Sequence, residues 1–435
     1  MTAPQLPNLF KVPELKEKIL FTLLCLVVYR VGAHVATPGV NVQALSDFLA
    51  TQGSGTLFSF YDLFAGGAFS RATVFALGIM PYISASIVFQ LAGPVFPVIE
   101  KMQRDEEGRK KLTQWTRYLT VVLCVFQAYG FAIFTEQLPG AVADPGLGFR
   151  LQTVLTLTTG GVFIMWLGEQ ITERGIGNGM SLLIFFSIIE RILPETLRTF
   201  EALRAGTLTL PVLVVVLIVM VLVVAGTVAV TVASRRIPIQ IPRKVMGRGR
   251  VREGQKTFIP LRLNTANVMP IIFAQSLIIV PGTLATFSNI PWLKEAANLF
   301  NTTSWVYVVT MTILIVFFAY FYTSIIFNPV DLAENLKKQG GFIPGVKPGA
   351  ATADHIDEVL SRITLPGALF LAGVAMLPII VSNLLNMPFG FGGTALLICV
   401  GVGLDTVQQV QQHLLLRHYD GFMKEGRVKF RGRNQ

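Results

Sequence analysis

Residues 210–233 have the sequence LPVLVVVLIVMVLVVAGTVAVTVA, an almost continuous run of apolar side chains without a charge. A helix needs about 20 mostly apolar residues to cross the hydrocarbon core of a bilayer. This stretch therefore predicts a membrane-spanning helix. The composition of the whole chain agrees, because 52% of its 435 residues are hydrophobic and only 14% are charged. Soluble domains carry about 25% charged residues, so the composition argues against an ordinary soluble enzyme and against disorder.

Ten stretches along the chain are long and apolar enough to be spans. They are residues 19–36, 72–92, 117–134, 151–168, 180–194, 210–233, 268–287, 305–327, 365–386 and 393–410. We therefore expect an all-α polytopic membrane protein with ten transmembrane helices. Ten spans could divide as five plus five, and two halves of five spans would have opposite topologies, as in an inverted repeat.

The positive charges predict the orientation. If the N-terminus is cytoplasmic, most of the 36 Lys and Arg residues fall on inside segments, as the positive-inside rule requires. Both termini are then cytoplasmic, in a multi-pass protein of the inner membrane. The expected organisation is a cytoplasmic segment 1–18, an N-terminal half 19–194 with spans 1–5, an external hinge loop 195–209, a C-terminal half 210–410 with spans 6–10 and cytoplasmic loops 234–267 and 328–364, and a basic tail 411–435.

The loop 234–267 is strongly basic, with Glu253 as its single acid. Its alternating Ile237, Ile239 and Ile241, interrupted by prolines, predict a hairpin or an extended arm. Positive-inside topology alone does not need so many bases on one arm, so this loop favours a docking surface. For the loop 328–364, which mixes acids and bases, topology and docking remain equal alternatives.

The segment 57–71 is apolar and aromatic but too short to cross a bilayer. Gly66 and Gly67 separate it from the following span, because glycine readily leaves helical geometry. It predicts either an interfacial helix or a re-entrant piece buried in protein, which is where irregular backbone survives at membrane depth.

Catalytic machinery is not evident in the sequence. The four histidines form no metal-binding motif, the three cysteines lie far apart, and no phosphate-binding loop occurs. We therefore expect no enzyme activity, no metal and no cofactor. The pairs Ile79/Ile83 and Ile184/Ile188, each one helical turn apart, suit either ordinary packing or an apolar constriction that excludes water.

Three long motifs resemble the bacterial SecY family, the large subunit of a protein-conducting channel. They are FALGIMPYISAS at residues 75–86, GEQITERGIGNGMS at 168–181 and NPVDLAENLKKQGGFIPG at 328–345. The resemblance extends from about residue 8 to the C-terminal tail. It implies two pseudo-symmetric five-helix halves, spans 1–5 and 6–10, around a central hourglass pore.

The resemblance also assigns site residues. By motif position, the apolar pore ring would be Ile79, Ile83, Ile184, Ile188, Ile272 and Ile398. The segment 57–71 would be the plug that fills the outer funnel, with Phe60, Tyr61, Leu63, Phe64, Gly66 and Gly67 as its main residues. A lateral gate would lie between spans 2 and 3 and spans 7 and 8. Within it we infer contacts at Gln90, Gln127, Asn267 and Ser276, whose alternative role is ordinary interhelical hydrogen bonding.

The partners follow from the same resemblance. The cytoplasmic loops would dock the ribosome or the SecA motor ATPase, through Arg243, Lys244, Arg248, Arg250, Arg252 and Lys347. Many relatives carry arginine at the position of Lys347, and lysine keeps the charge but loses the bidentate fork. SecE and SecG would be the small subunits, and preprotein signal sequences, nascent chains and membrane lipids would meet the channel.

The alternative from another class is a ten-helix secondary transporter of a small solute. That function predicts charged residues near the bilayer midplane, and these spans are almost free of them. It also leaves the basic cytoplasmic loops unexplained.

Overall fold

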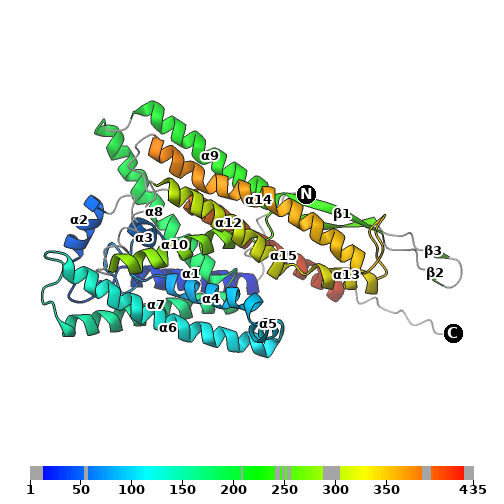
Figure 1. The fold of residues 1–435 in the computed structure, drawn as a ribbon, viewed down its shortest axis with the longest axis horizontal. Coiled ribbons are helices and arrows are strands. Elements are labelled where there is room, and N and C mark those ends of the chain that lie inside the picture. The colour runs from blue at the N-terminus through cyan, green and yellow to red at the C-terminus, as the bar shows by residue number, and fades with distance from the viewer. Residues whose placement is uncertain are drawn as a thin grey trace.

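The computed structural model describes residues 13–52, 57–206, 209–240, 245–246, 250–251, 256–287, 304–384 and 393–425. Figure 1 shows an elongated bundle of helices from which a β-hairpin extends at one end. We refer to this as the hairpin end, and to the end where α2 (Val42–Gln52) lies as the opposite end.

Each of the ten predicted spans overlaps a helix. In the first half these are α1 (Pro13–Gly32), α4 (Met80–Val95), α6 (Glu106–Gln137), α7 (Leu147–Arg174) and α8 (Gly179–Arg204). In the second half they are α9 (Leu210–Val232), α10 (Met269–Phe287), α12 (Trp305–Ile326), α14 (Ala350–Leu384) and α15 (Gly393–Glu425). Shorter helices are α2, α3 (Leu57–Phe64), α5 (Pro97–Arg104) and α13 (Pro329–Lys338).

Length and composition alone make five helical segments of the described residues able to cross a bilayer, and the bent pair α4–α5 is a sixth candidate. The most apolar of them is α9, and only 11% of its apolar window is buried inside the protein. A helix that is hydrophobic all round and exposed on most sides is suited to a lipid environment. The chain is therefore a mostly helical, multi-pass membrane protein.

The second predicted span starts later than expected. Residues 72–79 form turns, and α4 begins only at Met80. Gly78 has φ of 56°, a conformation that suits glycine, and Pro81 favours the first turn of a helix. The prediction of a helix from residue 72 is therefore wrong for its first turns.

Three further boundaries differ from those predicted. α8 continues to Arg204, so most of the predicted hinge loop 195–209 is helical. α14 begins at Ala350 and thus occupies the last part of the predicted loop 328–364. α15 reaches Glu425, well into the predicted tail 411–435. In each case a helix extends beyond its apolar stretch, which hydropathy cannot register.

The basic loop forms the hairpin that its alternating isoleucines predict. β1 (Ser234–Gln240) pairs antiparallel with β4 (Lys256–Arg262), and the short strands β2 (Val245–Met246) and β3 (Arg250–Val251) pair with each other. Ile237 and Ile239 are buried, while the residues between and beside them are exposed. Ile241 lies outside the described residues.

The two predicted cytoplasmic loops share one hydrophobic core. The hairpin contributes Ile237, Ile239 and Leu261, and residues from the other loop complete the cluster, namely Leu336, Ile343, Ile356 and Leu360. Gln240 and Phe342 also exchange two backbone hydrogen bonds of 3.0 Å. The loops therefore form a single folded unit at the hairpin end (Figure 1).

This shared core predicts that one side chain on α14 supports the hairpin. Ile356 is fully buried in the cluster, so Ile356→Ala should destabilise the unit by about 2–5 kcal/mol. Limited trypsin digestion should then cleave the loops faster than in the wild type. Val330→Ala on α13, where Val330 is 55% exposed, is the matched control and should not change the rate. Equal cleavage of all three proteins would contradict a shared core.

Candidate functional site

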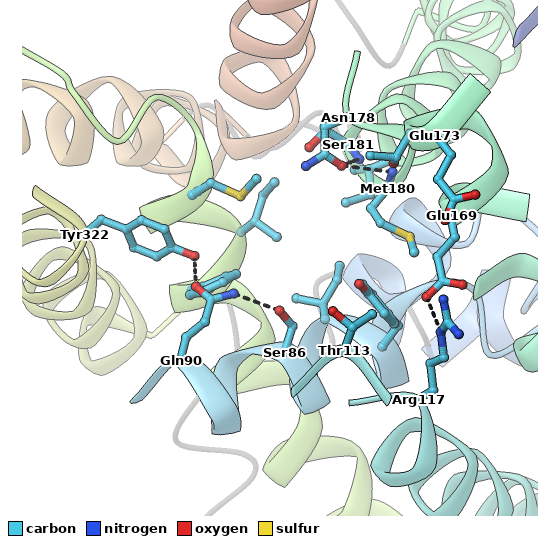
Figure 2. Close-up of a pocket in the computed structure, with 17 residues that line it drawn as sticks. Ser86, Gln90, Thr113, Arg117, Glu169, Glu173, Asn178, Met180, Ser181 and Tyr322 are labelled. Atoms are coloured by element: carbon cyan, nitrogen blue, oxygen red, sulfur yellow. Dashed lines mark hydrogen bonds and ion pairs between the residues drawn. The ribbon is translucent and has the colours of Figure 1, made fainter. Parts of the chain in front are cut away.

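A cavity of about 310 Å³ lies between the two halves of the chain. Its walls come from α4, α6, α7 and α8 of the first half and from α10 and α12 of the second (Figure 2). The lining combines apolar side chains with polar ones, and Figure 2 shows polar groups on both sides, with Gln90 and Tyr322 on one and Arg117 and Glu169 on the other. Because both halves form the cavity, its shape changes when the halves move relative to each other. The cavity is therefore a candidate for part of a gated path.

The six isoleucines that the resemblance assigns to a pore ring are all buried in the main hydrophobic cluster. None is more than 5% exposed; they are Ile79, Ile83, Ile184, Ile188, Ile272 and Ile398. Three of these side chains line the cavity, namely Ile83, Ile184 and Ile272. Ile79 lies directly before α4, four residues ahead of Ile83, and Ile188 lies one helical turn after Ile184 on α8. Five of the six isoleucines thus lie at one end of the cavity or just beyond it.

The segment 57–71 lies beyond these isoleucines. Gly78, beside Ile79, approaches Ala65 so closely that a Cβ on Gly78 would lie 3.3 Å from the Cα of Ala65. A Cβ on Gly66 would lie 3.2 Å from the Cα of Ser187, the neighbour of Ile188. Cavity, isoleucines and segment therefore follow one another along the molecule.

The segment is buried in protein rather than laid on a surface. Tyr61, Leu63 and Phe64 are each at most 4% exposed, and α3 packs against α8 and α10. The hydroxyl of Tyr61 donates to the carbonyl of Leu77 over 2.9 Å. Gly66 and Gly67 have φ of 64° and 77°, which requires glycine. The side chain of Phe60 lies outside the described residues.

One hydrogen bond crosses the cavity between the halves. The hydroxyl of Tyr322 on α12 donates to Oε1 of Gln90 on α4 over 2.5 Å, and Nε2 of Gln90 donates to Oγ of Ser86 (Figure 2). Within the described part of the chain, Gln90 is thus the one predicted gate residue that hydrogen-bonds across the two halves. Sequence reasoning missed Tyr322, since nothing local marks a tyrosine in an aromatic helix as a partner for a distant glutamine.

The other predicted gate residues make contacts elsewhere. Gln127 on α6 is buried beside Tyr61, whose hydroxyl lies 3.4 Å from its Oε1. Asn267 donates through Nδ2 to Asp405 on α15, within the second half, over 2.8 Å. Ser276 donates to the carbonyl of Ile272 on its own helix. Their role in a gate stays a prediction.

One edge of the cavity carries an ion pair that the sequence did not reveal. Nε of Arg117 on α6 lies 2.8 Å from Oε1 of Glu169 on α7, and Figure 2 shows the pair at the cavity edge. Nearby, Oδ1 of Asn178 accepts from the backbone N–H groups of Met180 and Ser181 and so caps α8. Asn178 belongs to the glycine-rich turn 175–179, so this motif starts a helix at the cavity wall.

Most of the predicted docking residues cannot be placed. Arg243, Lys244, Arg248 and Arg252 lie outside the described residues, and Arg250 lies on β3 with no description of its side chain. Lys347 is exposed on the loop before α14. Within the described ranges, no group of three or more histidine, cysteine or acidic side chains could hold a metal ion.

Comparison with known proteins decides the family. The family model for SecY matches residues 73–407. The chain is also 43% identical over 427 residues to the protein translocase subunit SecY of Aquifex aeolicus (strain VF5), covering 96% of this chain and 99% of that protein. The chain belongs to the SecY family. Membership agrees with the three motifs that carry the resemblance and with the helical fold.

Solved SecY-type channels have the same fold. A structure described as showing that the plug domain of SecY stabilises the closed state and maintains a membrane seal matches with a TM-score of 0.67 and 19% identity. It covers 98% of this chain and all of that one. Sec61 in a canine ribosome–channel complex matches with a TM-score of 0.61, at 17% identity and with the same coverage. The ten-helix count of this SecY-family chain fits that fold.

The cross-half hydrogen bond yields a prediction. Tyr322→Phe removes only the hydroxyl and should weaken the contact between α4 and α12 by about 1 kcal/mol. The distance distribution between spin labels on the two helices should broaden. Tyr320→Phe is the matched control, because the Tyr320 hydroxyl donates to the carbonyl of Ser361 within the second half. Equal distributions in both variants would show that the bond does not hold the helices together.

Proposed function

We propose that this chain forms the pore of a protein-conducting channel in the bacterial inner membrane, with both termini in the cytoplasm. It passes unfolded polypeptides across the bilayer and releases transmembrane segments sideways into it. The observation that carries the proposal is the succession of cavity, isoleucines and buried segment along the boundary of the two halves. The sequence similarity of the chain to protein translocase subunits favours this function over transport of a small solute.

The six isoleucines act as the seal of the pore. Their side chains are apolar and stiff at χ1, so they can close around an extended chain without forming hydrogen bonds to it. An ion that enters such a constriction loses its water and gains no replacement, so the constriction blocks ions while a polypeptide slides through. The segment 57–71 is the plug that fills the space beyond this ring at rest.

The lateral gate opens between α4 and α6 on one side and α10 and α12 on the other. The hydrogen bond from Tyr322 to Gln90 is its latching contact on the cavity side. A bond of this kind contributes about 1 kcal/mol, so an arriving hydrophobic helix can replace it. Apolar segments then partition into lipid, as their transfer free energy favours.

The channel is passive, and its partners supply direction and energy. The folded unit at the hairpin end, with its basic arm, docks the ribosome or the SecA ATPase by attraction to anionic groups. SecE and SecG contribute helices outside this chain. Signal sequences and nascent chains are the cargo, and membrane lipids receive the released helices. The chain itself catalyses no reaction and binds no cofactor.

The seal predicts an ion leak when it is damaged. Ile83→Gly and Ile188→Asn should raise the resting conductance of the reconstituted channel in planar bilayers, because water and ions can then enter the constriction. Ile83→Val keeps a β-branched apolar side chain and should stay tight. Unchanged conductance in both damaged variants would remove these residues from the ring, and counterflow of a small solute through the wild type would favour a transporter.

The basic arm predicts a charge-dependent affinity. Reversing Arg243, Lys244 and Arg248 to glutamate should weaken ribosome binding by at least about tenfold at low salt and flatten its dependence on salt concentration. Co-sedimentation over a salt series measures both. Reversal of Lys337 and Lys338, at the end of α13, is the matched control on the neighbouring loop. If ribosome and SecA affinities both survive reversal of the arm, the arm is not the docking site.

A further inference from the structure

The segment 57–71 is fastened by its charges as well as by apolar packing. Asp62, only 6% exposed, lies with Oδ2 2.9 Å from Nη1 of Arg191 on α8. Its other oxygen, Oδ1, accepts from the backbone N–H of Ser70 over 2.8 Å. Asp62 thus ties α3 to the residues that follow the glycine turn, and it ties the segment to α8.

Arg71, at the end of the segment, makes a second attachment. Its guanidinium donates to the carbonyl oxygens of Gly66 and Gly67 over 2.8 and 2.9 Å and so holds the glycine turn. Its Nη2 also lies 2.9 Å from Oε1 of Glu190 on α8. Arg30 of α1 pairs with the same carboxylate. Nη1 of Arg71 lies 2.8 Å from Nε2 of His34.

Both ion pairs that the described residues give this segment lead to adjacent positions on one helix, Glu190 and Arg191 of α8. Asp62 and Arg71 are the only charged residues between positions 57 and 71, and both are used. The second half approaches the segment through α10, whose neighbouring residues 270–279 carry no charge. The charged attachment therefore belongs to the first half alone.

We propose that the pairs Asp62–Arg191 and Arg71–Glu190 form a latch that holds the plug to the first half and sets how readily the channel opens. This inference rests on the proposed function and assigns positioning residues within it. When the halves separate, the apolar contact with α10 is lost but the latch remains. The plug leaves the pore only when Asp62 parts from Arg191 and Arg71 parts from Glu190.

The energetics suit such a role. A partly buried pair attracts more strongly than one in water, and its separation leaves two charges that must find new partners or solvent. α3 lies on the side of the molecule where α2 marks the opposite end (Figure 1), and Arg71 and Arg191 are already partly exposed, so outward movement of the plug can hydrate both charges. Inward movement would drag Asp62 past the isoleucines without a partner. The latch thus both resists opening and favours one direction of release.

The test compares resting conductance of the reconstituted complete channel in planar bilayers. Asp62→Asn keeps an oxygen for the Ser70 N–H and removes the charge, and Arg191→Gln removes the partner. Each should raise resting conductance about tenfold, equivalent to about 1.4 kcal/mol. Because both remove the same interaction, the double variant should leak no more than the leakier single variant. Arg191→Lys keeps the positive charge, so its resting conductance should stay close to that of the wild type.

Two controls make the outcome decisive. Arg150→Gln breaks the pair Arg150–Glu136, which has similar exposure and touches no part of the segment, and it should stay tight. Deletion of 57–71 gives the leak of an unplugged channel. A leaky deletion with wild-type conductance in Asp62→Asn and Arg191→Gln overturns the latch alone, as does a double variant whose leak is the product of the two. A tight deletion overturns the plug, and the latch with it.

Discussion

A polypeptide backbone inside a bilayer has no water to bond to, and the rest of this structure depends on that constraint. Most of the chain meets it with long helices whose backbone groups bond internally. The segment 57–79 does not, since it contains a short helix, two glycine turns and a run of turns before α4. Such backbone is stable at this depth only because both halves enclose it, so the irregular segment and the two-half architecture require each other.

Enclosure of an irregular segment also explains where polar groups occur. The carbonyl oxygens of Gly66 and Gly67 accept hydrogen bonds from the guanidinium of Arg71. The carbonyl oxygen of Leu77 accepts one from the hydroxyl of Tyr61. These side chains replace the backbone partners that a regular helix would supply. The apolar isoleucines lie on the other side of this network, between it and the cavity. Polar support and apolar seal are thus separated along the molecule.

Much of the fold follows from local pattern. Hydropathy locates a helix at each predicted span, and alternation predicts the β1–β4 hairpin, because both signals lie within one element. The pairings Gln90–Tyr322 and Asp62–Arg191 join residues far apart in sequence, and neither leaves a local trace. The same holds for the core shared by the two loops. In the sequence the loops look like two independent stretches, one basic and one of mixed charge, whereas in the structure Ile239 and Ile356 belong to one hydrophobic cluster. The later start of α4 at Met80 reflects contact with Ala65, another distant neighbour.

The charges of the segment 57–71 have an electrical consequence. Asp62 and Arg71 cancel, so movement of the whole segment through the membrane transfers no net charge. A single uncompensated charge would gain or lose about 2.3 kcal/mol for each 100 mV of potential. The balanced segment avoids this work whichever way it moves. Changes in membrane voltage therefore exert no net electrical force that would displace the segment from its resting position.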